Sequence, residues 1–293
     1  MSFTQPVIEI QGLRKEYAGF CLQDLNLTIE DGTITGLVGA NGAGKSTTLK
    51  LILNLIRRDA GSIRIFGMDN REMEREIKAQ IGVVFDEPCF HEILTPRQIS
   101  GYMGALYAGW DPACFTRLLD RFSLPAAKVV KEFSRGMKMK LAIAAAMAHH
   151  PRLLLLDEPT SGLDPLVRDE ILDMFLEFLQ DEHHAIVLSS HITSDLEKVA
   201  DTIALIDQGK LLFHEEKDLL REQYVLLKGS AAQLAKLDQN LLIGVRTNEY
   251  GFEALAKSRR QAVYAGLSAE RPTIEDILLF FTRASRAGAN SGL

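Results

Sequence analysis

Long apolar runs are missing from this sequence. No stretch of 18 apolar residues occurs, because the nearest candidate, 141–156, is interrupted by the polar sequence HHPR at 149–152. We therefore expect no membrane-spanning helix. The first ten residues, MSFTQPVIEI, lack a basic region followed by an apolar one, so we expect no signal peptide.

The sequence also lacks a basic excess and paired cysteines. Its 33 Lys and Arg are outnumbered by 39 Asp and Glu, which gives a net charge of −6. Proteins whose main task is nucleic-acid binding are usually basic, so we expect no nucleic-acid partner. Cys21, Cys89 and Cys114 are widely spaced and form no CxxC pair, which indicates reduced thiols.

The order of the predicted elements favours an α/β fold. A β-prone run at 33–38 leads through a glycine cluster into a helical stretch at 46–56. Residues 153–156 are all leucine, as expected for a parallel-sheet strand buried on both faces. Other runs indicate strands at 7–10, 25–29, 81–85 and 185–188, a mainly helical region at 90–150, and a hairpin at 202–206 and 210–214.

The pattern changes after about residue 217. Short strand-like and helical runs alternate, and a last helix is predicted over 272–284, capped by Thr273 with Asp276. Residues 285–293 are rich in Gly, Ala, Asn and Ser, so we expect a flexible tail. The predicted division is therefore a domain over 1–216, a small α+β accessory domain over 217–284, and the tail.

Residues 39–47, GANGAGKST, form a complete phosphate-binding P-loop between a predicted strand and a predicted helix. Its glycines let backbone N–H groups converge on phosphate oxygens, Lys45 would reach the β- and γ-phosphates, and Ser46 would bind Mg²⁺. The remaining candidates for phosphate contact in this loop are Gly39, Asn41, Gly42, Gly44 and Thr47.

An acidic pair follows the leucine strand. Asp157 would reach the metal, and Glu158 could act on an attacking water as a general base. Acidic residues also end strands simply as helix caps, but the order of this pair and the P-loop favours the functional interpretation. A further anion site is indicated at Ser134-Arg135-Gly136, at the start of a run of good helix formers.

These motifs together resemble the ATP-binding subunit of an ABC transporter. The P-loop, 134–136, 157–158, the SGLD sequence at 161–164 and His191 occur in the family's order, and the resemblance covers roughly residues 7–215. It implies a P-loop NTPase with an antiparallel β subdomain and a helical subdomain at about 87–150. It also implies a dimer that sandwiches two ATP molecules and a separate membrane permease.

The resemblance also assigns roles to individual residues. Ser134 and Gly136 would contact the γ-phosphate of ATP held by the partner chain, and Asp164 would link the two sites of the dimer. His191 matches the histidine that contacts the γ-phosphate and organises the water. Tyr17 matches the aromatic residue that stacks on adenine, although a strand-edge tyrosine is an equal alternative.

Two motifs depart from the family pattern. The usual signature LSGGQ reads FSRGM here, so Arg135 either strengthens the attraction to nucleotide or faces solvent, and Met137 packs. The strand at 81–85 leads in the family to a Gln that touches Mg²⁺, and the matching residue here is Asp86. This carboxylate either approaches the metal or turns to solvent.

The sequence thus predicts an ATPase that uses ATP and Mg²⁺ and drives a separate permease at the cytoplasmic face of the cell membrane. Features such as the single short cassette and the C-terminal extension most resemble bacterial exporters. One alternative is an ABC-type ATPase that acts on a ribosome or DNA. A second is a subunit that binds but does not hydrolyse ATP, which the presence of Lys45, Glu158 and His191 argues against.

Overall fold

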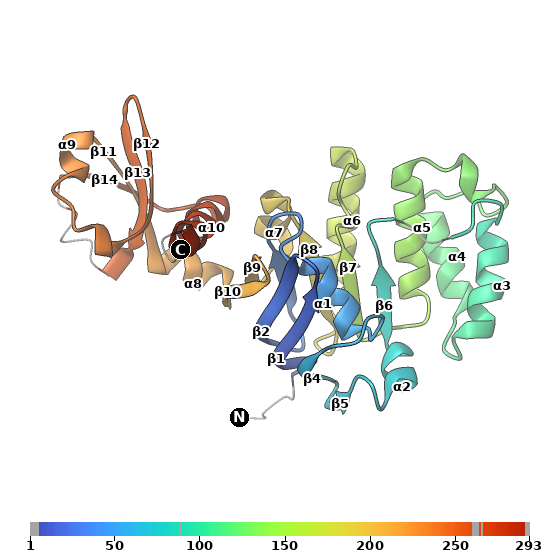
Figure 1. Cartoon of the computed structure of the whole chain (residues 1–293). Helices are drawn as coiled ribbons and strands as arrows, with labels where there is room; N and C mark the ends of the chain where they lie inside the picture. The colour runs from blue at the N-terminus through green and yellow to red at the C-terminus, as the bar shows by residue number, and fades with distance from the viewer. Residues whose placement is uncertain (1–5, 88–89, 260–263, 265, 291–293) are drawn as a thin grey trace.

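The core of the molecule is a six-stranded sheet of order β10-β9-β3-β8-β7-β6 (Figure 1). The computed structural model describes residues 6–87, 90–259, 264 and 266–290, so Cys89 and residues 291–293 lie outside it. Neighbouring strands are parallel except for the β9–β10 hairpin. The strands are β3 (Ile34–Val38), β6 (Ile81–Val84), β7 (Leu153–Asp157), β8 (Ala185–Ser190), β9 (Thr202–Asp207) and β10 (Lys210–Glu216).

The central sheet is buried on both faces, as the leucine run predicts. Leu153 and Leu155 pack into one apolar cluster and Leu154 and Leu156 into the other, because successive side chains of a strand point to opposite faces. One face is covered by an antiparallel sheet and by helices α1 and α2, and the other by α6 and α7. These helices are α1 (Lys45–Ile52), α2 (Glu74–Lys78), α6 (Pro165–Phe178) and α7 (Thr193–Val199).

The antiparallel sheet has the order β2-β1-β4-β5. It consists of β1 (Ile8–Tyr17), β2 (Phe20–Ile29), β4 (Ala60–Ile65) and β5 (Met68–Asp69).

Helix α1 ends four residues earlier than predicted. Asn54 adopts a left-handed conformation with φ 52°, which ends the helical path.

A group of helices extends from the β6 side of the sheet (Figure 1). It contains α3 (Pro96–Leu106), α4 (Pro112–Arg121), the short 3-10 helix η1 (Val130–Glu132) and α5 (Arg135–Met147). Each α-helix has a side-chain N-cap, supplied by Thr95, Asp111 and Ser134 respectively. The helical region predicted at 87–150 is thus three capped helices.

The C-terminal part forms a separate sheet of order β12-β13-β11-β14. Its elements are α8 (Lys217–Gln223), β11 (Tyr224–Gly229), α9 (Ala231–Leu234), η2 (Gln239–Leu241), β12 (Leu242–Asn248), β13 (Gly251–Lys257), β14 (Ser268–Glu270) and α10 (Ile274–Asn290). The length of the last helix differs from the prediction. The prediction that this helix ends at 284 is wrong, because α10 continues to Asn290. Residues 285–290 of the expected tail are therefore helical. Alanines favour helix here, and Arg286 forms an ion pair with Asp207 at 3.1 Å.

Helix α10 lies between the C-terminal sheet and the central sheet (Figure 1). Its backbone N–H of Ile274 donates to Glu197 of α7 at 3.1 Å, and the ring centroids of Phe281 and Phe213 of β10 lie 5.0 Å apart. The buried side chains of α10 belong to the same apolar cluster as those of α6 and α7. The C-terminal part therefore shares a core with the rest of the chain.

Within the described residues, no helix has the length and apolar character needed to cross a membrane.

The shared core predicts that α10 stabilises the whole described structure. Ile277 is fully buried, so Ile277→Ala should lower the free energy of unfolding by about 2–4 kcal/mol. Arg283→Ala on the exposed face of the same helix is the control and should change it by less than about 0.5 kcal/mol. Urea unfolding of both variants measures this. Equal stability of the two variants would mean that α10 does not contribute to the core.

Candidate nucleotide site

A cavity of about 620 Å³ lies at the carboxyl ends of β3 and β7, the edge where ligands bind in parallel α/β sheets. The P-loop and the acidic residues after β6 and β7 line it together. The lining residues are Gly19, Phe20, Ala40, Asn41, Gly42, Gly44, Lys45, Ser46, Thr47, Asp86, Asp157 and Glu158. The structure thus brings together the predicted phosphate-binding and acidic residues.

The P-loop glycines are required by the backbone. A Cβ added to Gly39 would lie 2.1 Å from the carbonyl oxygen of Ile206 in β9, a distance that no side chain tolerates. Gly42 has φ 79°, a left-handed conformation that favours glycine. The loop then runs directly into the N-terminus of α1, where unpaired N–H groups favour an anion.

Lys45, Glu158 and His191 form a chain of contacts at this cavity. The buried ammonium of Lys45 donates to the carbonyl oxygen of Gly39 at 2.8 Å and lies 3.4 Å from Oε1 of Glu158. The other carboxylate oxygen, Oε2 of Glu158, lies 2.6 Å from Nδ1 of His191. Each carboxylate oxygen of Glu158 thus has its own partner, and the contacts fix the direction of the carboxylate.

Glu158 adopts a strained backbone conformation. Its φ is 53°, in the left-handed region that residues other than glycine rarely adopt. Its N–H donates to the carbonyl oxygen of Ser189 of β8 at 3.0 Å. Such strain persists only where surrounding contacts enforce it, and it is concentrated at functional sites. The turn directly after Asp157 therefore supports a functional interpretation of the acidic pair.

Asp157 provides the clearest place for a metal ion. It is only 6% exposed, and its Oδ1 is buried without a hydrogen-bond partner among the residues that the structure describes. Ser46 and Asp86 line the same cavity. Hydroxyl and carboxylate oxygens are the ligands that Mg²⁺ prefers, and a buried carboxylate oxygen without a protein donor favours a cation nearby. The residues present therefore fit Mg²⁺, with Asp157, Ser46 and Asp86 as the candidates to hold it.

The aromatic residue in the cavity lining is Phe20 rather than Tyr17. Tyr17 pairs directly with Phe20 across the β1–β2 turn, so the two side chains lie on the same face of the hairpin. Tyr17 is 44% exposed, and Nζ of Lys15 lies 5.3 Å from its ring. Stacking of Tyr17 on a base stays a prediction, and Phe20 is the residue that sequence reasoning missed.

The residues of the expected signature lie at the start of α5. The Ser134 hydroxyl accepts from the N–H of Met137 at 3.2 Å, which leaves its own O–H free to donate. Met137 packs against the apolar core, as predicted. Ser134, Gly136 and Asp164 do not line the cavity described above, and Asp164 caps α6 by accepting from Val167 at 3.0 Å. Their contact with a partner's nucleotide stays a prediction.

Arg135 has a partner that the sequence did not predict. Its Nη2 lies 2.8 Å from Oδ1 of Asp86, which lines the nucleotide cavity. The two interpretations of Arg135, nucleotide attraction and solvent exposure, did not include an ion pair within the chain. The signal in the sequence was that two of the departures from the family pattern, Arg135 and Asp86, carry opposite charges.

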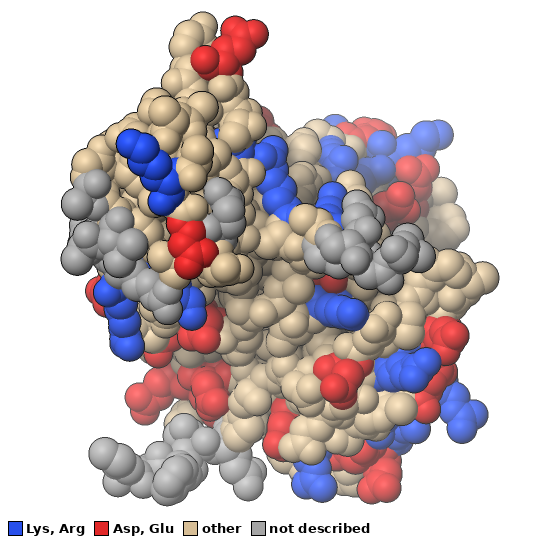
Figure 2. All heavy atoms as spheres, turned by 60° about the vertical axis from the view of Figure 1, so that its left-hand side comes forward, with Lys and Arg blue, Asp and Glu red and all other residues tan. Residues whose placement is uncertain are grey.

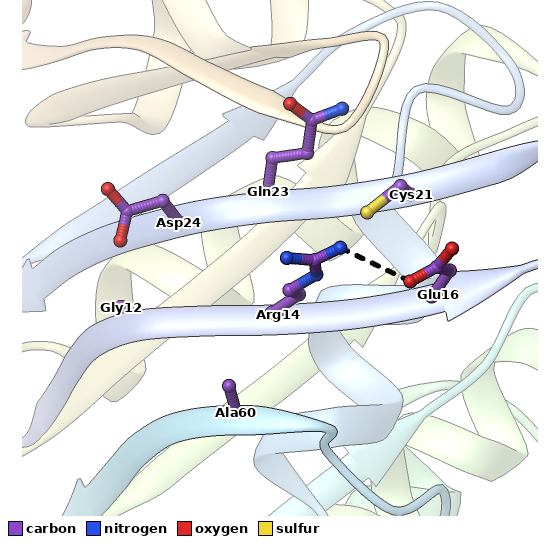
Figure 3. Close-up of a pocket in the computed structure, with 7 residues that line it drawn as sticks. All are labelled: Gly12, Arg14, Glu16, Cys21, Gln23, Asp24 and Ala60. Atoms are coloured by element: carbon purple, nitrogen blue, oxygen red, sulfur yellow. Dashed lines mark hydrogen bonds and ion pairs between the residues drawn. The ribbon is translucent and has the colours of Figure 1, made fainter.

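A second hollow of about 600 Å³ lies on the antiparallel sheet, where Gly12 and Ala60 leave space between larger side chains (Figure 3). Arg14 pairs with Glu16, two residues further along β1, at 3.2 Å (Figure 3). Because the charge of Arg14 is already neutralised, this hollow offers no concentrated charge for a phosphate. The cavity at the P-loop is the better candidate.

Comparison with known proteins agrees with this geometry. The family model described as ABC transporter matches residues 22–161. The bacitracin transport ATP-binding protein BcrA of Bacillus licheniformis is 35% identical over 220 residues, which cover 74% of this chain and 72% of BcrA. The chain belongs to the ABC transporter family. Its ABC-type α/β fold and its function as an ATP-binding, ATP-hydrolysing subunit follow from that membership.

Two further comparisons support the assignment to ABC transporters. The lantibiotic transport ATP-binding protein SrtF of Streptococcus pyogenes is 36% identical over 215 residues, covering 72% of this chain and 92% of SrtF. A solved structure of an ATP-binding subunit of an ABC transporter superimposes with a TM-score of 0.68 at 29% identity and covers 74% of this chain and 92% of that one. The region matched by the ABC transporter family model contains the P-loop and the acidic pair.

The orphaned carboxylate oxygen of Asp157 predicts how this ABC subunit depends on Mg²⁺. Asp157→Asn removes the negative charge at nearly constant shape, so the Mg²⁺ concentration needed to strengthen ATP binding should rise at least about tenfold. Titration of a fluorescent ATP analogue at several Mg²⁺ concentrations measures this. The control is Asp169→Asn, an exposed carboxylate that pairs with Lys198. If both variants respond to Mg²⁺ like the parent, Asp157 is not a metal ligand.

Proposed function

We propose that this chain binds ATP with Mg²⁺ at the P-loop cavity, dimerises around two ATP molecules and drives a separate exporter permease. The observation that carries the proposal is the contact chain of Lys45, Glu158 and His191 beside the buried Asp157. Lys45, the candidate phosphate-binding cation, and Glu158, the candidate general base, thus line one cavity, and His191 contacts Glu158 beside it. This combination of residues is typical of a site that hydrolyses a phosphoanhydride bond.

Each of these residues has a distinct chemical role in hydrolysis. The P-loop N–H groups and Lys45 bind the phosphates, and Glu158 accepts a proton from the attacking water. His191 orients Glu158 through their 2.6 Å contact. Mg²⁺, when bound, neutralises phosphate charge, and Asp157, Ser46 and Asp86 are the residues proposed to hold it. Because Lys45 lies 3.4 Å from Glu158, phosphate and carboxylate compete for the same ammonium.

The position of the signature supports a second copy of the chain, or a related subunit, as a partner. Ser134 and Gly136 lie at the N-terminus of a 13-residue helix, where N–H groups and a free hydroxyl can bind an anion. They do not line their own chain's cavity. We infer that they close the nucleotide site of the partner, as the family resemblance implies.

The permease contact is proposed at an apolar groove beside β6. This groove of about 250 Å³ is lined by residues of α3, α5 and the β6 strand, and Leu106 at its edge is 76% exposed. An exposed apolar edge in contact with a groove is typical of a protein–protein interface. The chain would then lie at the cytoplasmic face of the membrane, held there by the permease.

The relatives and the surface charge favour transport of a cargo over action on nucleic acid. BcrA and SrtF are named for the transport of bacitracin and of a lantibiotic, so we propose a peptide antibiotic or a related compound as cargo. On the face shown in Figure 2, basic and acidic side chains are interspersed rather than gathered by sign. Such a mixture gives nucleic acid no continuous basic surface to bind.

The Glu158→Gln variant tests the proposed chemistry. It should bind ATP normally and hydrolyse it about 10²–10⁴-fold more slowly, because the general base is lost while the shape stays. It should also accumulate as a dimer with Mg-ATP, visible by size-exclusion chromatography. As the matched control, Ser134→Arg added to this variant should keep ATP binding and abolish the dimer. Near-normal turnover of Glu158→Gln would remove Glu158 from its role.

The Leu106→Asp variant tests the permease contact. A charge at this exposed edge should reduce recovery of the chain with membranes that contain its permease by roughly tenfold or more, with unchanged ATP hydrolysis in solution. The control is Leu55→Asp, a 52% exposed leucine outside the groove. Equal recovery of both variants would place the contact elsewhere. Recovery with ribosomes or DNA instead would favour the alternative class of ABC ATPase.

A further inference from the structure

The ion pair between Arg135 and Asp86 joins the helical region to the nucleotide cavity. Asp86 follows β6 and lines the cavity together with Ser46, Asp157 and Glu158, whereas Arg135 is the first residue of α5. Their side chains meet at 2.8 Å although the residues are 49 positions apart in the sequence. This pair is a direct side-chain connection between the start of α5 and the candidate metal ligands.

A second contact restricts where Arg135 can lie. A Cβ added to Gly162, in the loop between β7 and α6, would lie 3.1 Å from Nη1 of Arg135. The guanidinium therefore rests against this loop while it reaches Asp86. Gly162 has φ 68°, a conformation that favours glycine, and the absence of a side chain there leaves room for the guanidinium.

The neighbouring charges leave Arg135 as the cation for Asp86. The two residues line a hollow of about 510 Å³ together with Glu87, Glu92, Phe133 and Lys138. Lys138, one turn further along α5, pairs with Glu92 at 3.3 Å and not with Asp86. Among the ion pairs of the described residues, Arg135 is thus the cation that contacts Asp86.

The pair is too exposed to serve mainly as a stabiliser of the fold. The Arg135 and Asp86 side chains are 52% and 49% exposed, and ion pairs in contact with solvent contribute little to the free energy of unfolding. A planar guanidinium nevertheless fixes the direction of a carboxylate well, because its donors form a rigid fork. The geometry of Asp86, more than the stability of the chain, therefore depends on this contact.

We propose that Arg135 is a positioning residue for Asp86, holding its carboxylate at the rim of the nucleotide cavity. The inference rests on the proposed function, because it takes the cavity to bind ATP with Mg²⁺. Any cation that draws Asp86 toward the P-loop competes with Arg135 for the same carboxylate. Nucleotide binding and the contact of α5 with the cavity are then coupled, and the coupling acts in both directions.

The coupling predicts that loss of Arg135 changes how ATP binding depends on the Mg²⁺ concentration. The affinity for ATP in the absence of Mg²⁺ should stay the same. In Arg135→Ala, the Mg²⁺ concentration that gives half of the gain in ATP binding should fall at least about fivefold, because the guanidinium no longer competes with the metal for Asp86. Arg135→Lys should restore part of the shift, since it keeps the charge and loses the fork. Arg135→Ala should add nothing in an Asp86→Ala background, because the residue it positions is gone.

The measurement is a titration of a fluorescent, non-hydrolysable ATP analogue against Mg²⁺. It is performed on the full chain at a concentration where size-exclusion chromatography shows a monomer, so that a contact of Arg135 with a partner's nucleotide does not contribute. Lys138→Ala is the matched control, because it breaks a neighbouring exposed ion pair on the same helix. Its Mg²⁺ curve should match that of the parent chain.

Three outcomes would overturn the inference. An unchanged Mg²⁺ curve for Arg135→Ala would show that Asp86 needs no positioning. Equal shifts in Arg135→Ala and Lys138→Ala would indicate a general effect of charge on α5, and additive effects of the Arg135 and Asp86 changes would mean that they act independently. If the parent chain itself binds the analogue without any response to Mg²⁺, the proposed metal site fails, and this result is distinct from the other three.

Discussion

The parallel register of β3, β8 and β7 is the constraint on which the site depends. Leu37 of β3 and Asp157 of β7 both pair with Ser189 of β8, so the three strands end at the same level. The P-loop follows β3, Glu158 follows β7 and His191 follows β8. Segments distant in the sequence therefore meet at one edge, and the contacts from Lys45 to Glu158 to His191 follow from strand pairing.

Close packing around the P-loop extends this constraint to β9. The carbonyl oxygen of Ile206 lies so near Gly39 that only glycine fits, and Gly209 donates its N–H to Ala43 at 2.9 Å. The β9–β10 hairpin thus supports the back of the phosphate-binding loop. Asp207 in the same strand is buried and pairs with Arg286 of α10, so the C-terminal helix contacts the strand that supports the loop.

This arrangement gives the C-terminal part a structural connection to the ATPase region. Residues of α8, β11 and α10 contribute to the larger apolar cluster, including Leu220, Leu226 and Phe280. The opposite face of the C-terminal sheet has its own cluster around Leu227 and Phe252. Two-sided burial of this sheet explains why it forms a layer of its own while α8 and α10 connect it to the core of the rest of the chain. Whether residues 217–284 act as a separate domain stays a prediction.

The sequence by itself determined the motifs and most strands, because these depend on residue spacing within short segments. The P-loop and the acidic pair after the leucine run could both be read locally. Only the tertiary structure decided that Phe20 lines the cavity, that Arg135 pairs with Asp86, and that α10 continues to Asn290. Each of these depends on partners distant in the sequence, and residue types and spacing do not specify which distant side chains come together.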